Sequence, residues 1–182
     1  MKKHVTFSNI LFVIAIVFVL YTPTRIWIIS KLSFSPSIEK IEDNKVITNF
    51  NWGLKGLNTS DINFSELKGK VIFLNFWATW CPPCVAELPY IDAFYKDYKD
   101  KVAFIFISNE NKKEIEIFFK KEGFNFPVYQ SKNTSLEGLP IVKSIPRTFV
   151  IDAKGNIRVD KSGAADWNSN TFRKQINLLL AE

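Results

Sequence analysis

The sequence has few residues of the kinds that bind metals, and it has only one pair of cysteines. Among its 182 residues are one histidine, His4, and two cysteines, Cys81 and Cys84. A structural zinc site draws four ligands mostly from cysteine and histidine, so the composition excludes such a site. Covalent haem attachment needs a histidine directly after the second cysteine, and that position holds Val85. Reversible disulfide chemistry remains, and it implies neither a metal nor a small-molecule cofactor.

Excess charge is also missing once the N-terminal segment is set aside. The formal net charge is +6, but the first 31 residues hold four basic residues and no acid. Without Lys2, Lys3, Arg25 and Lys31, the remaining 20 basic residues face 18 acidic ones. Such a balanced surface does not attract a polyanion, and we expect no nucleic-acid partner.

The N-terminal segment has the composition of a membrane anchor. An apolar run from Ile10 to Tyr21 follows two lysines and can be extended to cover positions 5–29. Small residues two apart, as signal cleavage requires, first occur at Ser33 and Ser35, well beyond the run. The run also has no polar face, which argues against a helix buried in a soluble core. We therefore expect a signal-anchor that is retained.

These features divide the chain into three parts. We expect residues 1–30 to be the anchor, residues 31–45 a tether, and residues 46–182 a single domain. The basic end of the anchor predicts a cytoplasmic N-terminus. The expected location is the bacterial inner membrane, crossed once, with the domain on the extracytoplasmic side.

The apolar pattern of the domain predicts an α/β fold. The expected elements are a hairpin within 46–64, strands at 71–76, 102–107 and 126–129, helices between the first two strands and at 111–122, a hairpin over 148–159, and a final helix capped by Ser169. Continuous apolar strands belong in the middle of a sheet that is covered on both sides. We predict a central mixed sheet flanked by helices on both faces, with the first hairpin added before the core.

The cysteine pair stands at the predicted start of the first of these helices. Proline is tolerated in the first helical turn, so Pro82 and Pro83 place Cys81 at the N-cap. The helix dipole then favours the Cys81 thiolate, and the N–H of Cys84 is the donor left for its sulfur. A purely structural disulfide is the competing interpretation, but so small a ring constrains the unfolded chain very little.

A family resemblance rests on these residues. The stretch Phe-Trp-Ala-Thr-Trp-Cys-Pro-Pro-Cys at 76–84, with Glu87, Pro89 and the distant Ile145-Pro146, resembles the thioredoxin superfamily. Within it, the sequence is similar to the membrane-tethered TlpA/ResA-like thiol-disulfide oxidoreductases, over about residues 45 to 181. The resemblance implies a thioredoxin-like fold.

The resemblance also implies roles for individual residues. Cys81 corresponds to the attacking cysteine, Cys84 to the resolving one, and Pro146 to a cis-proline beside them. Cytoplasmic thioredoxins carry a buried aspartate six residues before the first cysteine, whereas this chain has Asn75, which cannot take a proton. Proteins of this kind act as reductants, including on apocytochromes before haem attachment. They are re-reduced by an electron-donor protein of the membrane.

Further residues near the motif are candidates for the site. Glu87 falls on the helix face that carries Cys84, where a buried carboxylate could move protons; the alternative is a solvated acid that only helps the helix dipole. Trp80 is the better candidate for substrate contact, and Trp77 for the core. With Trp80, the substrate-binding candidates are Pro82, Pro83, Ile145 and Pro146.

The same stretch bears on the direction of electron transfer and on two rival functions. Pro82 and Pro83 remove N–H donors that would stabilise a thiolate, which favours a reductant over a strong oxidant. A peroxide-reducing enzyme of this superfamily usually has Thr-x-x-Cys, and the third residue before Cys81 is Ala78. A copper-handling binding module would pair the cysteines with a histidine, which the expected domain lacks.

Overall fold

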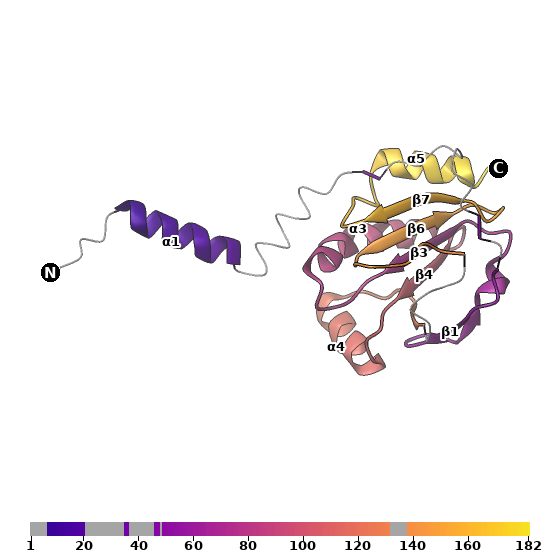
Figure 1. The fold of residues 1–182 in the computed structure, drawn as a ribbon, viewed down its shortest axis with the longest axis horizontal. Helices are drawn as coiled ribbons and strands as arrows, with labels where there is room; N and C mark the ends of the chain where they lie inside the picture. The colour runs from indigo at the N-terminus through magenta and orange to yellow at the C-terminus, as the bar shows by residue number, and fades with distance from the viewer. Residues whose placement is uncertain (1–6, 21–34, 37–45, 48, 132–137) are drawn as a thin grey trace.

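The computed structural model describes residues 7–20, 35–36, 46–47, 49–131 and 138–182. Its strands are β1 (Gly53–Gly56), β2 (Ile62–Asn63), β3 (Ile72–Phe76), β4 (Ala103–Ile107), β5 (Val128–Gln130), β6 (Arg147–Ile151) and β7 (Ile157–Ser162). Its helices are α1 (Phe7–Leu20), the 3-10 helix η1 (Phe64–Leu67), α3 (Pro82–Tyr98), α4 (Lys112–Glu122) and α5 (Asn170–Leu179). Figure 1 shows their arrangement.

The strands form one mixed sheet in the order β2-β1-β5-β4-β3-β6-β7. The three central strands β3, β4 and β5 run parallel, as the crossovers through α3 and α4 require. Strand β6 lies antiparallel to β3 and is followed by β7 in the predicted hairpin. This order brings the end of β3, where the motif begins, next to the start of β6, where Pro146 lies.

Two apolar clusters cover the two faces of the sheet. Alternate residues of β3 divide between them: Phe73 packs with side chains of α3, α4 and α5, and Ile72 and Leu74 pack on the opposite side. The second cluster contains residues of η1 and of the segment that precedes it. The predicted mixed sheet with helical cover is therefore confirmed, and the cover of the second face is the short helix η1.

Local capping signals fix where the helices begin and end. Helix α4 has Asn111 as its N-cap, in a capping box with Glu114, and ends at Gly123 with a φ of 78°. Ser169 caps α5, and its hydroxyl accepts from the N–H of Phe172. These caps confirm the predicted boundaries.

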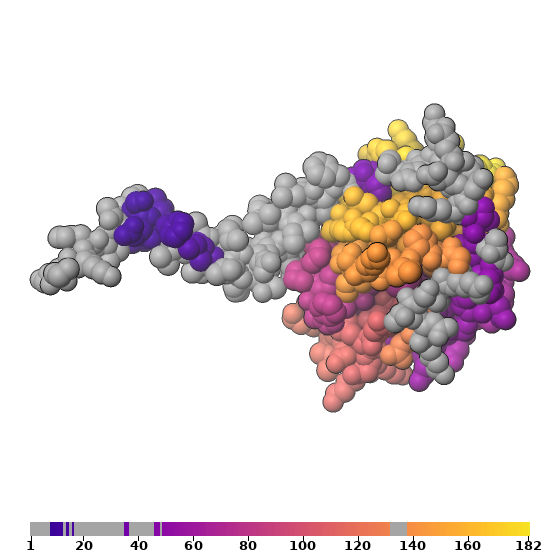
Figure 2. Space-filling view, in the orientation of Figure 1, coloured from indigo at the N-terminus to yellow at the C-terminus, as the bar shows by residue number. Residues whose placement is uncertain are grey.

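The N-terminal hairpin is present and extends the edge of the sheet. Strand β1 pairs antiparallel with β2 on one side and with β5 on the other. Trp52, predicted to serve packing, stacks on Phe64 with ring centroids 4.3 Å apart. The hairpin thus extends the sheet, and Trp52 beside it packs with η1 on the second face. Figure 2 shows the same face of the molecule as a surface, with the β6–β7 region in orange to yellow beside the middle of the chain in magenta to pink.

The expected anchor and tether lie mostly outside the described residues. Within the anchor, α1 is an apolar helix of 14 residues. Among the helices that the structure describes, none has the length and apolarity needed to cross a membrane.

Candidate active site

The two cysteines form a disulfide at the N-terminus of α3. Cys81 and Cys84 are joined through their sulfurs, with Cα atoms 5.2 Å apart. Cys81 is the N-cap, Pro82 and Pro83 follow in the first turn, and the Cys81 sulfur accepts from the N–H of Cys84 at 3.3 Å. The predicted N-cap position and its donor are both confirmed. The helix dipole is thus directed at the Cys81 sulfur. The two prolines of the first turn have no N–H group that could donate to this sulfur.

The surroundings of the pair differ in exposure. Cys84 is fully buried, Cys81 keeps 3% of its surface exposed, and Trp80 is 72% exposed. Trp77 is buried in the core, as predicted. Trp80 is therefore open to contact, Cys81 has only a small exposed surface, and Cys84 has none.

A cis-proline lies at the start of β6. The Ile145–Pro146 peptide bond is cis, as the family resemblance implied. Register places Arg147 opposite Phe76, the last residue of β3. Pro146 is therefore one step beyond this pair, at the same end of the sheet as the turn that leads to Cys81.

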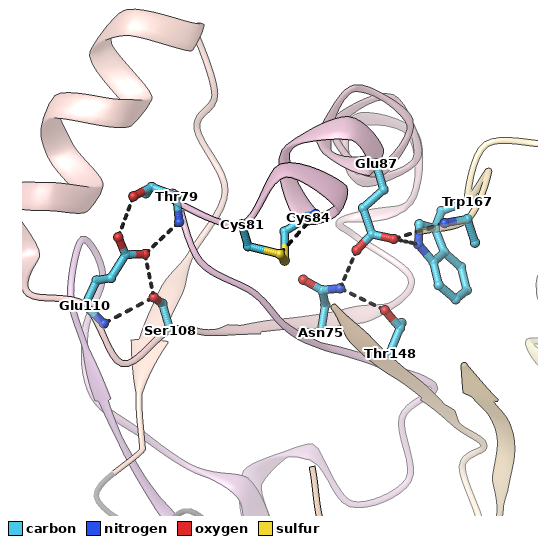
Figure 3. The surroundings of a disulfide bond; sticks show 10 residues. Asn75, Thr79, Cys81, Cys84, Glu87, Ser108, Glu110, Thr148 and Trp167 are labelled. Atoms are coloured by element: carbon cyan, nitrogen blue, oxygen red, sulfur yellow. Dashed lines mark hydrogen bonds between the residues drawn. A yellow bond between two sulfur atoms is a disulfide. The ribbon is translucent and has the colours of Figure 1, made fainter. Parts of the chain in front are cut away.

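Glu87 is buried and fully engaged on the inner side of the disulfide (Figure 3). Its carboxylate accepts from the indole N–H of Trp167 at 2.8 Å, from the Asn75 amide at 3.0 Å and from the Ala165 N–H at 3.2 Å. The Asn75 amide nitrogen also donates to the Thr148 hydroxyl at 2.8 Å. Glu87 thus joins α3, β3, and the loop between β7 and α5.

Burial raises the pKa of Glu87 from 4.5 to about 7, because the charged form is poorly solvated. The hydrogen bonds from Trp167, Asn75 and Ala165 oppose this rise. A carboxyl with such a pKa changes protonation near neutral pH, within one helical turn of Cys84. The interpretation of Glu87 as a solvated first-turn acid is wrong, since its side chain is inside the protein.

A second carboxylate fixes the turn before the disulfide. Glu110, just after β4, accepts hydrogen bonds from both the N–H and the hydroxyl of Thr79, the N–H at 2.7 Å. The Ser108 hydroxyl donates to the same carboxylate at 3.0 Å. Because Thr79 directly precedes Trp80, this network holds the residue that presents Trp80 and Cys81 (Figure 3).

An apolar cleft of about 520 Å³ opens beside this turn. It is lined by residues 76–78 and Trp80, by Ile107, Asn109 and Glu110, by Ser131, and by residues 142–145. Trp80 directly precedes Cys81 and Ile145 directly precedes the cis-proline, so the cleft wall includes a neighbour of each. In the parts of the chain that are described, no group of three or more histidine, cysteine and acidic side chains converges to hold a metal.

Sequence reasoning missed three members of the site. Glu110 follows β4, whose carboxyl end lies beside that of β3, and this topological signal could have identified it. Thr148 and Trp167 carry no such signal. They reach Asn75 and Glu87 from 73 and 80 residues away, which only the tertiary structure reveals.

Comparison with known proteins gives consistent matches. Residues 40–176 match the model of the Redoxin family. The thiol-disulfide oxidoreductase ResA of a Bacillus cereus strain is 37% identical over 121 residues, covering 65% of this chain and 69% of that protein. ResA of Bacillus subtilis is 38% identical over 109 residues, covering 59% and 61%.

Solved structures show the same architecture. The crystal structure of StoA from Bacillus subtilis superposes with a TM-score of 0.55 at 28% identity, covering 70% of this chain and 94% of StoA. The crystal structure of a thiol:disulfide interchange protein of the thioredoxin family from Chlorobium tepidum gives a TM-score of 0.57 at 25% identity, covering 80% and 96%.

Proposed function

Because the chain belongs to the Redoxin family and is a ResA-like thiol-disulfide oxidoreductase, we propose that it reduces protein disulfides through reversible oxidation of Cys81 and Cys84. One observation carries this proposal: the two cysteines form a disulfide at the start of α3, with Cys81 as the N-cap. In that position the helix dipole favours the thiolate, which is the nucleophile in exchange.

The proposed exchange has two steps. The Cys81 thiolate attacks a client disulfide, forms a mixed disulfide and releases one client thiolate. The Cys84 thiol then loses its proton and attacks the Cys81 sulfur, which releases the second client thiol and leaves Cys81–Cys84 oxidised. Two electrons pass to the client, and a dithiol donor protein returns them.

Glu87 is proposed as the proton acceptor for the second step. Burial raises the pKa of a thiol, so a nearby base accelerates its deprotonation. Glu87 lies three residues after Cys84 on α3, and burial has raised its pKa to about 7. It can therefore both gain and lose a proton in the range in which thiols exchange.

Client contact is proposed at the exposed side of the disulfide. Trp80 offers a large exposed aromatic surface, and the apolar cleft beside it accepts side chains of the client. The partly exposed Pro82, Pro83 and Ile145 complete the contact area around Cys81, and the cis-bonded Pro146 next to Ile145 is buried.

We further propose that the domain acts outside the cytoplasm, held by an anchor in residues 1–30. The apolar run and its basic flank support the anchor. The shortage of N–H donors at Cys81 supports the role of reductant, because a less stabilised thiolate makes the pair a weaker oxidant. Apocytochromes awaiting haem attachment are the client class suggested by the resemblance to TlpA/ResA-like proteins, and a membrane electron-donor protein is the proposed source of electrons.

Trapping of mixed disulfides tests the division of roles. With Cys84→Ser the second step is blocked, so covalent adducts between Cys81 and client proteins should accumulate on non-reducing gels. With Cys81→Ser, adducts should be few because Cys84 is buried. Equal trapping by both variants would contradict the assignment of Cys81 as the nucleophile.

A further inference from the structure

One buried polar atom near the disulfide has no hydrogen-bond partner among the described residues. Asn75 is fully buried, and its amide nitrogen donates to both Glu87 and Thr148. Its carbonyl oxygen Oδ1 has no hydrogen-bond partner within the described chain. A buried acceptor without a donor is unfavourable and uncommon, so this atom requires an explanation.

The fold places Asn75 against the cysteine-bearing face of α3. Alternate residues of β3 point to one face, and Phe73, two positions before Asn75, belongs with Cys84 to the apolar cluster on the α3 side. The hydrogen bond to Glu87 ties the amide to α3 one turn after Cys84. In Figure 3 the amide oxygen lies on the side of the disulfide, and the amide nitrogen lies toward Glu87 and Thr148.

The orientation of the amide follows from its neighbour. An ionised carboxylate only accepts hydrogen bonds, so Glu87 holds the NH₂ group of Asn75 on its side. The oxygen is left facing the cysteines. A disulfide has no hydrogen to donate, whereas each thiol has one. The donor that Oδ1 lacks is therefore created when the disulfide is reduced.

We propose that Asn75 is a positioning residue for the reduced state, in which its Oδ1 accepts a hydrogen bond from the Cys84 thiol. Reduction breaks the bond between the two sulfurs with two electrons from a dithiol donor, which becomes a disulfide. One of the donor's two protons goes to the Cys84 sulfur, and the other goes to Cys81 or to water. The amide accepts that S–H without taking the proton, so it stabilises the neutral thiol. This inference rests on the proposed cycling of Cys81 and Cys84.

The predicted hydrogen bond can be observed in a protein that cannot cycle. The chain has two cysteines, so Cys81→Ala leaves one thiol, and its S–H stretching band in the infrared belongs to Cys84. Hydrogen bonding moves this band to lower wavenumber. We expect Asn75→Leu, which keeps the shape of the side chain, to move the band to higher wavenumber in the Cys81→Ala background.

Thr148→Val is the matched control, because it removes a partner of the Asn75 nitrogen and leaves the oxygen in place. We expect this variant to keep the band position. If Asn75→Leu does not fold, Asn75→Ala is used in its place, because it removes the same oxygen. A band that is unchanged on loss of Oδ1 would overturn the proposal, and it would leave the exchange function unaffected.

A redox equilibrium gives the second readout. The equilibrium is measured at about pH 8, where the Glu87 carboxyl is ionised and holds the amide nitrogen of Asn75 on its side. With two intact cysteines in contact with dithiothreitol, Asn75→Leu should be harder to reduce, with an equilibrium constant lower by about two- to fivefold, since a thiol is a weak donor. Equal or easier reduction than in the Thr148→Val control would contradict the proposal.

Discussion

At the scale of single residues, Glu87 is a buried carboxyl near the disulfide whose pKa lies close to neutral pH. Its folded-state pKa of about 7 lies above the ordinary 4.5 because burial outweighs three hydrogen bonds. A carboxyl with a raised pKa binds its proton more tightly in the folded protein than in the unfolded chain. Its contribution to stability is therefore complete below about pH 4.5 and is lost as pH rises toward 7.

The first prediction concerns this pH dependence. The disulfide form should lose about 3 kcal/mol of unfolding free energy between pH 4.5 and 7, and Glu87→Gln should remove that slope. Urea unfolding without reductant, at steps of half a pH unit, measures it. Trp167→Phe removes a hydrogen bond that lowers the pKa of Glu87, so this pKa should rise further. The pH-dependent loss of unfolding free energy in this variant should therefore extend to higher pH.

Asp152 provides an internal check on the sign. Burial raises the pKa of this carboxyl, but hydrogen bonds from Asn156, Arg158 and Lys154 outweigh burial and lower it below 3.8. Its contribution to stability is present above that pH and is lost in acid, outside the window of Glu87. A slope between pH 4.5 and 7 that survives in Glu87→Gln would show that another group causes it.

Residue types near the motif could be predicted from the sequence, and their partners could not. The spacing of three residues placed Glu87 on the face of Cys84, and the prolines placed Cys81 at the N-cap. Both inferences use helix geometry alone. The pKa of Glu87 depends on Trp167, which lies 80 residues away in the sequence. The value of this pKa could therefore not be predicted from the sequence.

At the scale of elements, the sheet edge depends on a close approach of backbone at Gly56. The Gly56 N–H donates to the Asp61 carboxylate at 2.9 Å, which closes the β1–β2 turn. A Cβ atom at Gly56 would lie 2.0 Å from the carbonyl oxygen of Thr59. At Gly53, at the other end of β1, a Cβ meets no atom within 4 Å.

The second prediction uses this matched pair. Gly56→Ala should destabilise the domain by at least about 2 kcal/mol, because the turn backbone must move. Gly53→Ala should change stability by less than about 1 kcal/mol, and in the stabilising direction. Denaturant unfolding of both variants compares them. Equal stabilities would show that the β1–β2 turn adapts without cost.

Elements with local signals were predictable, and the pairing of β1 was not. Apolar runs and caps identified β3, β4, α4 and α5 within one or two residues. The hairpin at 46–64 was expected before the core, but its junction with β5 joins Lys55 to Gln130, 75 positions apart. Nothing local in either segment encodes that contact, since edge strands pair through backbone groups common to all residues.

At the scale of the whole molecule, the sheet gathers the site from distant parts of the chain. The end of β3, the start of α3, the turn after β4 and the cis bond before β6 meet at one end of the sheet. Rigid strands therefore position the disulfide, the cleft and the Glu87 carboxyl relative to one another. The cleft itself was not predicted, because its walls come from four separate segments.

The third prediction concerns the proposed anchor. The chain should stay with the membrane fraction through a high-salt wash, since apolar insertion does not depend on ionic strength, whereas surface attachment does. Deletion of residues 1–30 should release the domain into the soluble fraction with its thiol-disulfide exchange intact. A mature N-terminus mapped beyond Ser30 would show that the segment is a cleaved signal.

The reduction potential of the Cys81–Cys84 pair tests the central claim most directly, because the claim is that this pair cycles and that it donates electrons to client disulfides. Equilibration of the full chain with dithiol buffers of known potential, followed by mass measurement of alkylated thiols, gives the value. The account predicts a potential at or below about −270 mV, the value for thioredoxin. A value near about −120 mV, that of a strong thiol oxidant, would contradict the proposed reductant, and a pair that cannot be reduced would contradict the cycling itself.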